Sequence, residues 1–268
     1  MVSRKIIKFV KLVASGNDFV VLEFSSSRVL ELRRLVRKIC DRKYGVGADG
    51  LLILKKSKVA DIKMRIFNAD GSEAQMCGNG ARCAALYAGK RRVTIETKAG
   101  IIESEVNADN VKVKLTEPKD MKLHMPIKVN NRTLHVNFIN TGVPHAIIFV
   151  EGIDKIGVSI LGRQIRYHKA FAPKGTNVDF VEVLNKNSIK IRTYERGVED
   201  ETLACGTGAV ASALIASCKL GIANCGKINV HTQGGEILKV YFEKIKNKFR
   251  NVRLEGKARI VCKGEYYV

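Results

Sequence analysis

One pattern occurs twice in this chain, and no other feature of the sequence constrains the fold as strongly. The first copy, MRIFNADGSEAQMCGNGARCAALYAG, covers residues 64–89, and the second, IRTYERGVEDETLACGTGAVASALIA, covers residues 191–216. In each copy a half-apolar strand leads through a polar turn to a cysteine, a Gly-x-Gly-Ala sequence and an alanine-rich helix. Because the copies lie about half a chain apart, the repeating unit is a domain, and the sequence predicts two related domains.

The two cysteines of the repeat, Cys77 and Cys205, are the candidate reactive groups. A cysteine at the first turn of a helix lies beside unpaired backbone N–H groups and the positive end of the helix dipole, and both stabilise a thiolate. The glycines that follow leave those N–H groups open to a carboxylate. An isolated cysteine among small residues is more often an inert buried thiol. Its recurrence in a matched context favours a reactive thiol beside an anion site in each half.

Hydrophobic periodicity predicts an α+β architecture for each half, with strands wrapped on a small-residue helix. The predicted strands cover residues 6–13, 19–22, 51–54, 61–67, 93–97, 102–106 and 111–115, then 134–140, 146–150, 176–183, 188–194, 228–232, 237–242 and 251–254. Helices are predicted near residues 32–39 and 160–167 and after each repeated cysteine. The stretch 117–126 lacks clear periodicity and is the predicted domain boundary, and one strand candidate, 258–261, is left over.

Composition restricts the class of protein. No apolar run approaches the roughly 20 residues that a membrane-spanning helix needs, so no membrane association is expected. The seven cysteines include no Cys-x-x-Cys pair and no zinc-like spacing, so we expect no disulfide framework, no metal site and a reducing cytoplasm. The net charge of +21 is spread along the chain and is interpreted as a solvated basic surface; a basic RNA-binding protein is the alternative.

Four motifs carry a resemblance to a known family. They are GNDF at 16–19, FNADGS at 67–72, MCGNGAR at 76–82, and ERG at 195–197 followed by ACGTG at 204–208. In this order they strongly resemble diaminopimelate epimerases. The resemblance implies two pseudo-symmetric halves, each a strand barrel around a central helix, with the active site in the cleft between them. It also implies that the last strand returns to the first half, which gives domains 1–117 with 258–268 and 118–257, and that the chain is a homodimer.

The resemblance also assigns roles to individual residues. Cys77 and Cys205 become the two acid/base groups, and His145 matches a histidine that assists one thiol. The implied substrate-binding residues are Asn17, Asn68 and Asn177 through their side chains, Glu195 and Arg196 at the distal end of the substrate, and Gly78, Asn79, Gly206 and Thr207 through backbone amides that grip the α-carboxylate. Two positions depart from many family members, which have Gln at Gly50 and Asn at Val143. The acidic residues near the repeat are expected to face solvent or cap turns: Asp70, Glu73, Glu199 and Glu201.

Inversion at a carbon by proton transfer needs a base on one face and an acid on the other, and a thiolate/thiol pair serves both directions of a reversible reaction. The amides at the helix N-termini would stabilise the charge that develops on the carboxylate, so no cofactor is expected. We therefore expect an epimerase that interconverts LL- and meso-diaminopimelate, with no specific nucleic-acid partner. The alternative within the same fold is a proline or hydroxyproline racemase, which tends to carry Cys-Gly-His where this chain has Cys77-Gly-Asn79.

Overall fold

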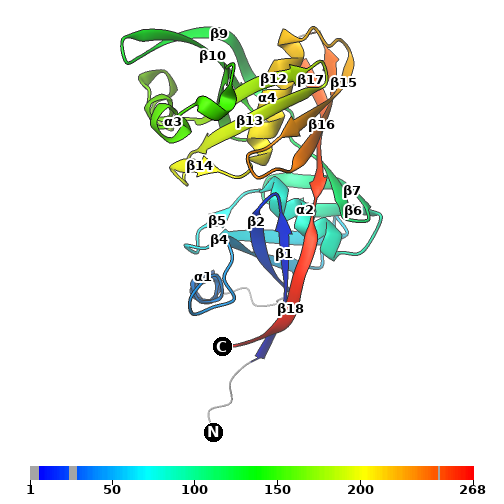
Figure 1. The fold of residues 1–268 in the computed structure, drawn as a ribbon. Helices are drawn as coiled ribbons and strands as arrows, with labels where there is room; N and C mark the ends of the chain where they lie inside the picture. The colour runs from blue at the N-terminus through cyan, green and yellow to red at the C-terminus, as the bar shows by residue number, and fades with distance from the viewer. Residues whose placement is uncertain (1–5, 24–28, 247) are drawn as a thin grey trace. The chain divides into compact units, whose positions relative to one another are not determined.

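The computed structural model describes residues 6–23, 29–246 and 248–268, and the chain divides into two compact units. Unit 1 comprises Met1–Val113 and Gly256–Val268, and unit 2 comprises Lys114–Glu255. The strands of each unit curve around one helix, α2 in unit 1 and α4 in unit 2 (Figure 1). The α+β architecture expected from the sequence is therefore confirmed.

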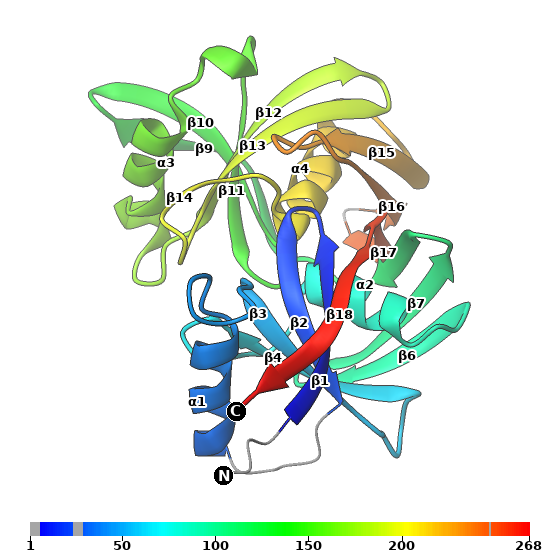
Figure 2. The same ribbon diagram turned by 60° about the horizontal axis from the view of Figure 1, so that its bottom comes forward.

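Unit 1 contains one mixed sheet in the order β18-β1-β2-β3-β4-β6-β7-β8. The β2–β3 and β4–β6 pairs are parallel and the other pairs antiparallel, and the short β5 adds to β4. The C-terminal strand β18 lies beside β1, near the N-terminus (Figure 2). The strand bounds are β1 Ile6–Ala14, β2 Asn17–Glu23, β3 Gly50–Lys55, β4 Ile62–Asn68, β5 Glu73–Ala74, β6 Arg92–Thr97, β7 Gly100–Asn107, β8 Asn110–Lys114 and β18 Arg259–Tyr267.

Unit 2 repeats this sheet strand for strand, in the order β9-β10-β11-β12-β13-β15-β16-β17. The β11–β12 and β13–β15 pairs are parallel, the others are antiparallel, and the short β14 adds to β13. The sequence repeat is thus a repeat of strand order and direction. The strand bounds are β9 Lys119–Val129, β10 Arg132–Asn140, β11 Pro144–Phe149, β12 Asn177–Asn185, β13 Ser188–Glu195, β14 Asp200–Thr202, β15 Cys225–His231, β16 Ile237–Ile245 and β17 Lys248–Lys257.

The two central helices are α2 (Gly78–Tyr87) and α4 (Gly206–Lys219). Their alanines are almost fully buried, because a methyl side chain lets a helix approach the inner face of a curved sheet closely. The outer helices, α1 (Val29–Ile39) and α3 (Val158–Arg166), each pack an apolar stripe on their own unit, and two short 3₁₀ turns cover Ile153–Lys155 and Lys169–Phe171.

One stretch differs from the sequence-based expectation. Residues 117–126, expected to be irregular, mostly form β9, an 11-residue strand that pairs only with β10 in the described part of unit 2. Its side chains are largely exposed until Ile127, so no alternation of apolar and polar residues marks the strand in the sequence. In strand order β9 takes the place in unit 2 that the returning strand β18 takes in unit 1.

Each unit also contains a copy of one ion pair. In unit 1 the Arg65 guanidinium donates to both carboxylate oxygens of Glu73, at 2.8 and 3.0 Å. In unit 2 Arg192 does the same to Glu201, at 2.7 Å for each bond. The expectation that these two glutamates face solvent or cap turns is wrong, because each is drawn onto β4 or β13 by a bidentate arginine.

The other two acidic residues near the repeat behave as the sequence suggests. Asp70 accepts hydrogen bonds from the backbone N–H and hydroxyl of Ser72, at 2.7 and 2.6 Å, within its turn. Glu199 accepts the N–H of Gly197 at 3.0 Å and pairs with Arg166. Both therefore cap turns.

Candidate active site

Each repeated cysteine is the N-cap residue of its helix. Cys77 precedes α2 with extended backbone angles, and its Sγ accepts the N–H of Gly80 at 3.5 Å. Cys205 precedes α4 in the same way and accepts the N–H of Gly208 at 3.4 Å. Both sulfurs thus lie at the positive end of a helix dipole, as the sequence predicts. They differ in exposure, because Cys77 is half-buried and Cys205 is only 5% exposed.

The second glycine of each motif is required by close packing. A Cβ at Gly80 would lie 3.0 Å from Ile66 Cδ1 and 3.2 Å from Leu52 Cδ2. A Cβ at Gly208 would overlap the carboxylate of Asp179. Glycine therefore lets the first turn of each helix pack closely against the sheet.

Three of the predicted asparagines lie in unit 1, on or near α2. Asn17 opens β2, and its side-chain oxygen is buried with no hydrogen-bond partner among the described residues. Asn68 ends β4, is exposed, and donates to the Ser72 hydroxyl at 2.9 Å. Asn79, on the first turn of α2, is buried and accepts a 2.6 Å hydrogen bond from Arg82. The Asn17 oxygen suits an N–H donor of a ligand, since a buried acceptor without a partner is costly.

A buried polar cluster surrounds Cys205 in unit 2. His145 contacts the Asp179 carboxylate through Nδ1 at 2.7 Å and the Thr207 hydroxyl through Nε2 at 3.0 Å. The Thr207 hydroxyl lies 3.4 Å from Cys205 Sγ. The side-chain oxygen of Asn177 accepts the N–H of Arg196 at 2.7 Å, and its amide nitrogen lies 3.3 Å from His145 Nε2. The structure thus brings together four predicted residues of the second half: Cys205, His145, Asn177 and Thr207.

The charges of this cluster act on the thiol. Burial raises the pKa of Cys205 well above its usual value, and the nearby carboxyl groups of Glu195 and Asp179 raise it further. Hydrogen bonds from Thr207 and Gly208 act in the opposite direction. Burial also raises the pKa of Glu195, while hydrogen bonds with Thr202 and with Cys205 itself lower it. Glu195, predicted on the distal end of a substrate, therefore lies beside the thiol in this structure.

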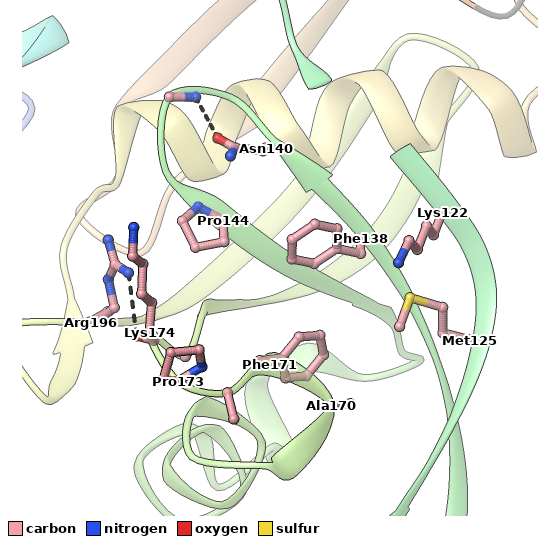
Figure 3. A pocket seen from close by; sticks show the side chains of 13 residues that line it. Lys122, Met125, Phe138, Asn140, Pro144, Ala170, Phe171, Pro173, Lys174 and Arg196 are labelled. Atoms are coloured by element: carbon pink, nitrogen blue, oxygen red, sulfur yellow. Dashed lines mark hydrogen bonds between the residues drawn. The ribbon is translucent and has the colours of Figure 1, made fainter. Parts of the chain in front are cut away.

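Arg196 lines a pocket of about 420 Å³ in unit 2. Its guanidinium donates to the backbone oxygen of Lys174 at 3.3 Å, and the two side chains lie together on one side of the pocket (Figure 3). Phe138, Phe171, Met125 and Lys122 line the opposite part. Cationic side chains beside apolar ones suit a ligand that carries anionic groups on a hydrocarbon chain.

The two departures from the family pattern lie in different units. Gly50 has no room for a larger side chain, because a Cβ there would lie 2.6 Å from the carbonyl oxygen of Phe67 and 3.3 Å from the Phe19 ring. Val143 is half-buried in the turn before β11, and its carbonyl accepts the N–H of Thr141 at 3.2 Å. The packing of unit 1 therefore requires glycine at position 50.

Sequence reasoning missed two members of the Cys205 cluster, Asp179 and Thr193. They are register partners on β12 and β13, and the Thr193 hydroxyl donates to Asp179 Oδ1 at 2.7 Å. The signal was present, because Asp179 interrupts the apolar segment Val178–Val181 of a buried strand. A carboxylate on such a strand needs polar partners in the core.

Residues 6–23, 29–246 and 248–268 contain no group of three or more His, Cys, Asp or Glu side chains placed to hold a metal ion. No helix within them is both long and apolar enough to cross a membrane.

The fold is shared with solved structures of several enzymes and biosynthetic proteins. A PhzF-family phenazine biosynthesis protein from Bacillus anthracis superposes with a TM-score of 0.77 over 98% of this chain and 100% of its own, at 21% identity. A hydroxyproline epimerase from Agrobacterium vitis gives 0.74 over 100% of this chain and 94% of its own, at 15% identity. The architecture thus defines the class of fold, which this chain shares with a hydroxyproline epimerase and a phenazine biosynthesis protein.

Sequence comparison is more specific. The family model for diaminopimelate epimerase matches residues 9–120 and 137–261, and this chain belongs to the diaminopimelate epimerase family. The diaminopimelate epimerase of Aquifex aeolicus is 45% identical over 260 residues, which are 90% of this chain and 92% of that protein. The one from Archaeoglobus fulgidus is 44% identical over 255 residues, 87% of this chain and 89% of that protein. The resemblance drawn from the motifs is confirmed.

Proposed function

We propose that this chain epimerises diaminopimelate between its LL and meso forms, with Cys77 and Cys205 as the acid/base pair. The observation that carries the proposal is the duplicated N-cap cysteine, one on each central helix. A helix N-terminus stabilises a thiolate and also binds a carboxylate. Relatives at 40–45% identity that bear the name diaminopimelate epimerase support this substrate over proline, since the hydroxyproline epimerase structure shares only 15% identity.

In the proposed reaction one thiolate removes the Cα proton and the other thiol delivers a proton to the opposite face. The α-carboxylate is held by the backbone amides of Gly78 and Asn79 and of Gly206 and Thr207. One such donor, aimed at developing charge, stabilises a transition state by about 3–4 kcal/mol. This electrostatic stabilisation takes the place of a cofactor as electron sink, and none is proposed.

The remaining predicted residues are proposed to hold the rest of the substrate. Arg196 suits the distal carboxylate, because its guanidinium already lies in a pocket with an apolar wall. The side-chain oxygen of Asn17, which has no hydrogen-bond partner within the described residues, suits an ammonium group. Asn68 and Asn177 complete the polar contacts. Glu195 is proposed to act on the Cys205 thiol as well, because its carboxyl group lies close enough to that thiol to raise its pKa.

Proton exchange in deuterated water tests the proposal. Solvent deuterium should enter Cα of LL- and meso-diaminopimelate, and L-proline should remain unlabelled. Labelling of proline without labelling of diaminopimelate would assign the chain to the racemase alternative. Treatment with a carbonyl-trapping reagent should leave the rate unchanged, since a Schiff-base cofactor takes no part in the proposed reaction.

We further propose that the chain works as a homodimer in a reducing compartment, in support of lysine biosynthesis. Exposed apolar side chains on the edge strand β18 support self-association, among them Ile260, Val261 and Tyr267. Light scattering after gel filtration measures the mass, and a monomer would overturn this part. The thiols must stay reduced to transfer protons, so activity should fall under oxidants and return with a thiol reductant.

A further inference from the structure

The polar cluster in unit 2 has a definite hydrogen-bond direction. A backbone N–H only donates, so the Asn177 atom that faces the Arg196 N–H at 2.7 Å is the oxygen. The other end of that amide is then NH₂, and it faces His145 Nε2 at 3.3 Å as a donor. Nε2 must accept, so the neutral imidazole carries its proton on Nδ1 and donates it to Asp179 Oδ2 at 2.7 Å.

Thr207 joins this histidine to the thiol. Its hydroxyl lies 3.0 Å from His145 Nε2, nearer than the Asn177 amide, and 3.4 Å from Cys205 Sγ. With Nε2 as an acceptor, the Thr207 hydroxyl donates to the imidazole and its oxygen is left to accept the S–H of Cys205. The backbone carbonyl of Thr207 accepts the Thr141 hydroxyl at 3.1 Å, which holds this residue in place.

Both carboxylate oxygens of Asp179 are hydrogen-bonded within the cluster. Its carboxylate and the His145 ring are both fully buried, so solvent does not replace their hydrogen bond. Its second oxygen accepts a hydrogen bond from the Thr193 hydroxyl at 2.7 Å. Because Gly208 has no side chain, the Asp179 carboxylate fits against the first turn of α4. A buried carboxylate is costly without such partners, so its placement beside a histidine marks a specific electrostatic role.

We propose that Asp179, His145 and the Thr207 hydroxyl form a proton relay for Cys205, with Asp179 as the positioning residue. When Cys205 becomes a base, its S–H bond breaks as an O–H bond forms at Thr207, and the original Thr207 proton passes to His145 Nε2. The products are a thiolate and an imidazolium paired with Asp179, and the reverse transfer restores the thiol. The proposal rests on the proposed function only in taking Cys205 to be a working base.

The relay answers a difficulty that the structure raises. Burial and the carboxyl groups of Glu195 and Asp179 hold the pKa of the Cys205 thiol well above its usual value. The groups that face the thiol are Glu195 from β13, Asp179 and His145 from β12 and β11, and Thr207 from its own helix. A proton moved to His145 leaves a cation between the thiolate and Asp179, so the thiolate forms beside a positive charge and not beside a second anion.

Four variants test the relay. Thr207→Val keeps the shape and removes the hydroxyl, Thr207→Ser restores it, and Asp179→Asn removes the charge that pairs with the imidazolium. Ser212→Ala is the control, because it removes another buried hydroxyl from α4 that has no partner among the described residues. All four should remain folded at the assay temperature, as followed by circular dichroism.

The first measurement is alkylation of each cysteine by iodoacetamide across pH, read by peptide mass spectrometry with Cys77 as the internal reference. Thr207→Val and Asp179→Asn should each slow alkylation of Cys205 near neutral pH by about tenfold or more, the order of one general acid–base contribution. Thr207→Ser and Ser212→Ala should match the parent. If Asp179 acted only through its own negative charge, its removal would speed alkylation, and that result would overturn the proposal.

The second measurement is turnover of diaminopimelate. Thr207→Val and Asp179→Asn should lower kcat about 10- to 100-fold with little change in KM, and Thr207→Ser should restore most of it. Rates within about twofold of the parent for both impaired variants would contradict the relay. Alkylation needs no substrate, so a parent chain that fails to turn over diaminopimelate refutes the proposed function while the alkylation result still decides the relay.

Discussion

The two units have the same strand order and the same N-cap cysteine, but the side chains behind the two thiols differ. Aligned on the repeat, His145, Asp179 and Thr193 of unit 2 correspond to three buried apolar residues of unit 1, which are Phe19, Leu52 and Ile66. Unit 1 instead buries a cation on its helix: Arg82 is fully buried and donates to Ser15 and Asn79.

This difference shows which features the two halves share and which side chains have diverged between them. The thiol position depends on the helix N-cap and on a glycine three residues later, and both units retain these features. The side chains under the helix are free to diverge as long as they fill the same volume. Cys77 therefore caps a helix that carries a buried cation, Arg82, whereas Cys205 lies beside buried carboxyl groups and a histidine. We expect the two cysteines to respond differently to the same perturbation.

The largest effect is expected from removal of either thiol. Cys77→Ala and Cys205→Ala should each lower epimerisation by about 1,000-fold or more, since each reaction face loses its only proton-transfer group. Each variant should still exchange the Cα proton of one stereoisomer with solvent, and the isomer should differ between the two. Deuterium incorporation followed by NMR measures both rates.

A control for this experiment lies on the same helix. Cys83→Ala removes a buried thiol of α2 that burial makes hard to ionise, since burial raises its pKa. Its turnover should stay close to that of the parent. Near-normal turnover in Cys77→Ala or Cys205→Ala would remove that cysteine from the mechanism.

The next effect distinguishes the units by their binding groups. Arg196 corresponds to Ala69 in the repeat, so only unit 2 places a cation at this position. Arg196→Ala should raise KM for diaminopimelate about 10- to 100-fold, the equivalent of about 1.5–3 kcal/mol for a hydrogen bond to a charged group. Arg196→Lys should recover part of this loss, because a lysine keeps the charge but not the bidentate geometry. An unchanged KM would place the distal carboxylate elsewhere.

The glycines three residues after each thiol, Gly80 and Gly208, allow the two units to be compared by the free energy of unfolding. Gly208→Ala forces a methyl group onto the buried Asp179 carboxylate and should destabilise the chain by about 1–3 kcal/mol. Gly80→Ala meets only the ends of two aliphatic side chains, at 3.0 and 3.2 Å, and helix propensity offsets part of the cost, so about 1 kcal/mol or less is expected. Urea unfolding measures both, and an equal loss in the two variants would contradict the difference described above.

The smallest difference concerns the duplicated ion pair. Glu73→Gln should cost about 2 kcal/mol at neutral pH, because hydrogen bonding to Arg65, with Lys98 adding to it, lowers the pKa of Glu73 to about 2 against the opposing effect of burial. Glu201→Gln should lower the free energy of unfolding by about 1 kcal/mol less than Glu73→Gln does. Arg192 also donates to the backbone carbonyls of Ile153 and Ile156, at 3.1 and 2.9 Å, and keeps these hydrogen bonds in the variant.

The pH dependence of stability gives the sign of the Glu73 effect. A carboxyl group whose folded-state pKa is lowered contributes stability above its unfolded pKa and loses it as the pH falls through the folded value. The parent should therefore lose stability between about pH 4.5 and pH 2, and Glu73→Gln should lose less over that window. Thermal unfolding at several pH values measures it, and identical slopes for parent and variant would contradict the assignment.

Much of the site could be predicted from the sequence because its signals are local. The N-cap position of Cys205, for example, follows from the residues within one turn of it. Local patterns were insufficient where a side chain meets partners from distant segments. Glu73 and Glu201 look like surface residues in the sequence, yet each is held by an arginine that reaches across from the neighbouring strand. The exposed strand β9 has no periodicity to reveal it.

The sequence by itself determined the duplicated α+β unit, the two helices and the two capping thiols, because short-range backbone geometry and periodic burial specify them. Only the tertiary structure decided what stands behind each thiol. The meeting of Asp179 with His145 depends on the parallel register of β11 and β12, and their meeting with Thr207 depends on how closely α4 packs on that sheet. Such contacts join residues far apart in the chain, and no local pattern encodes the register that brings them together.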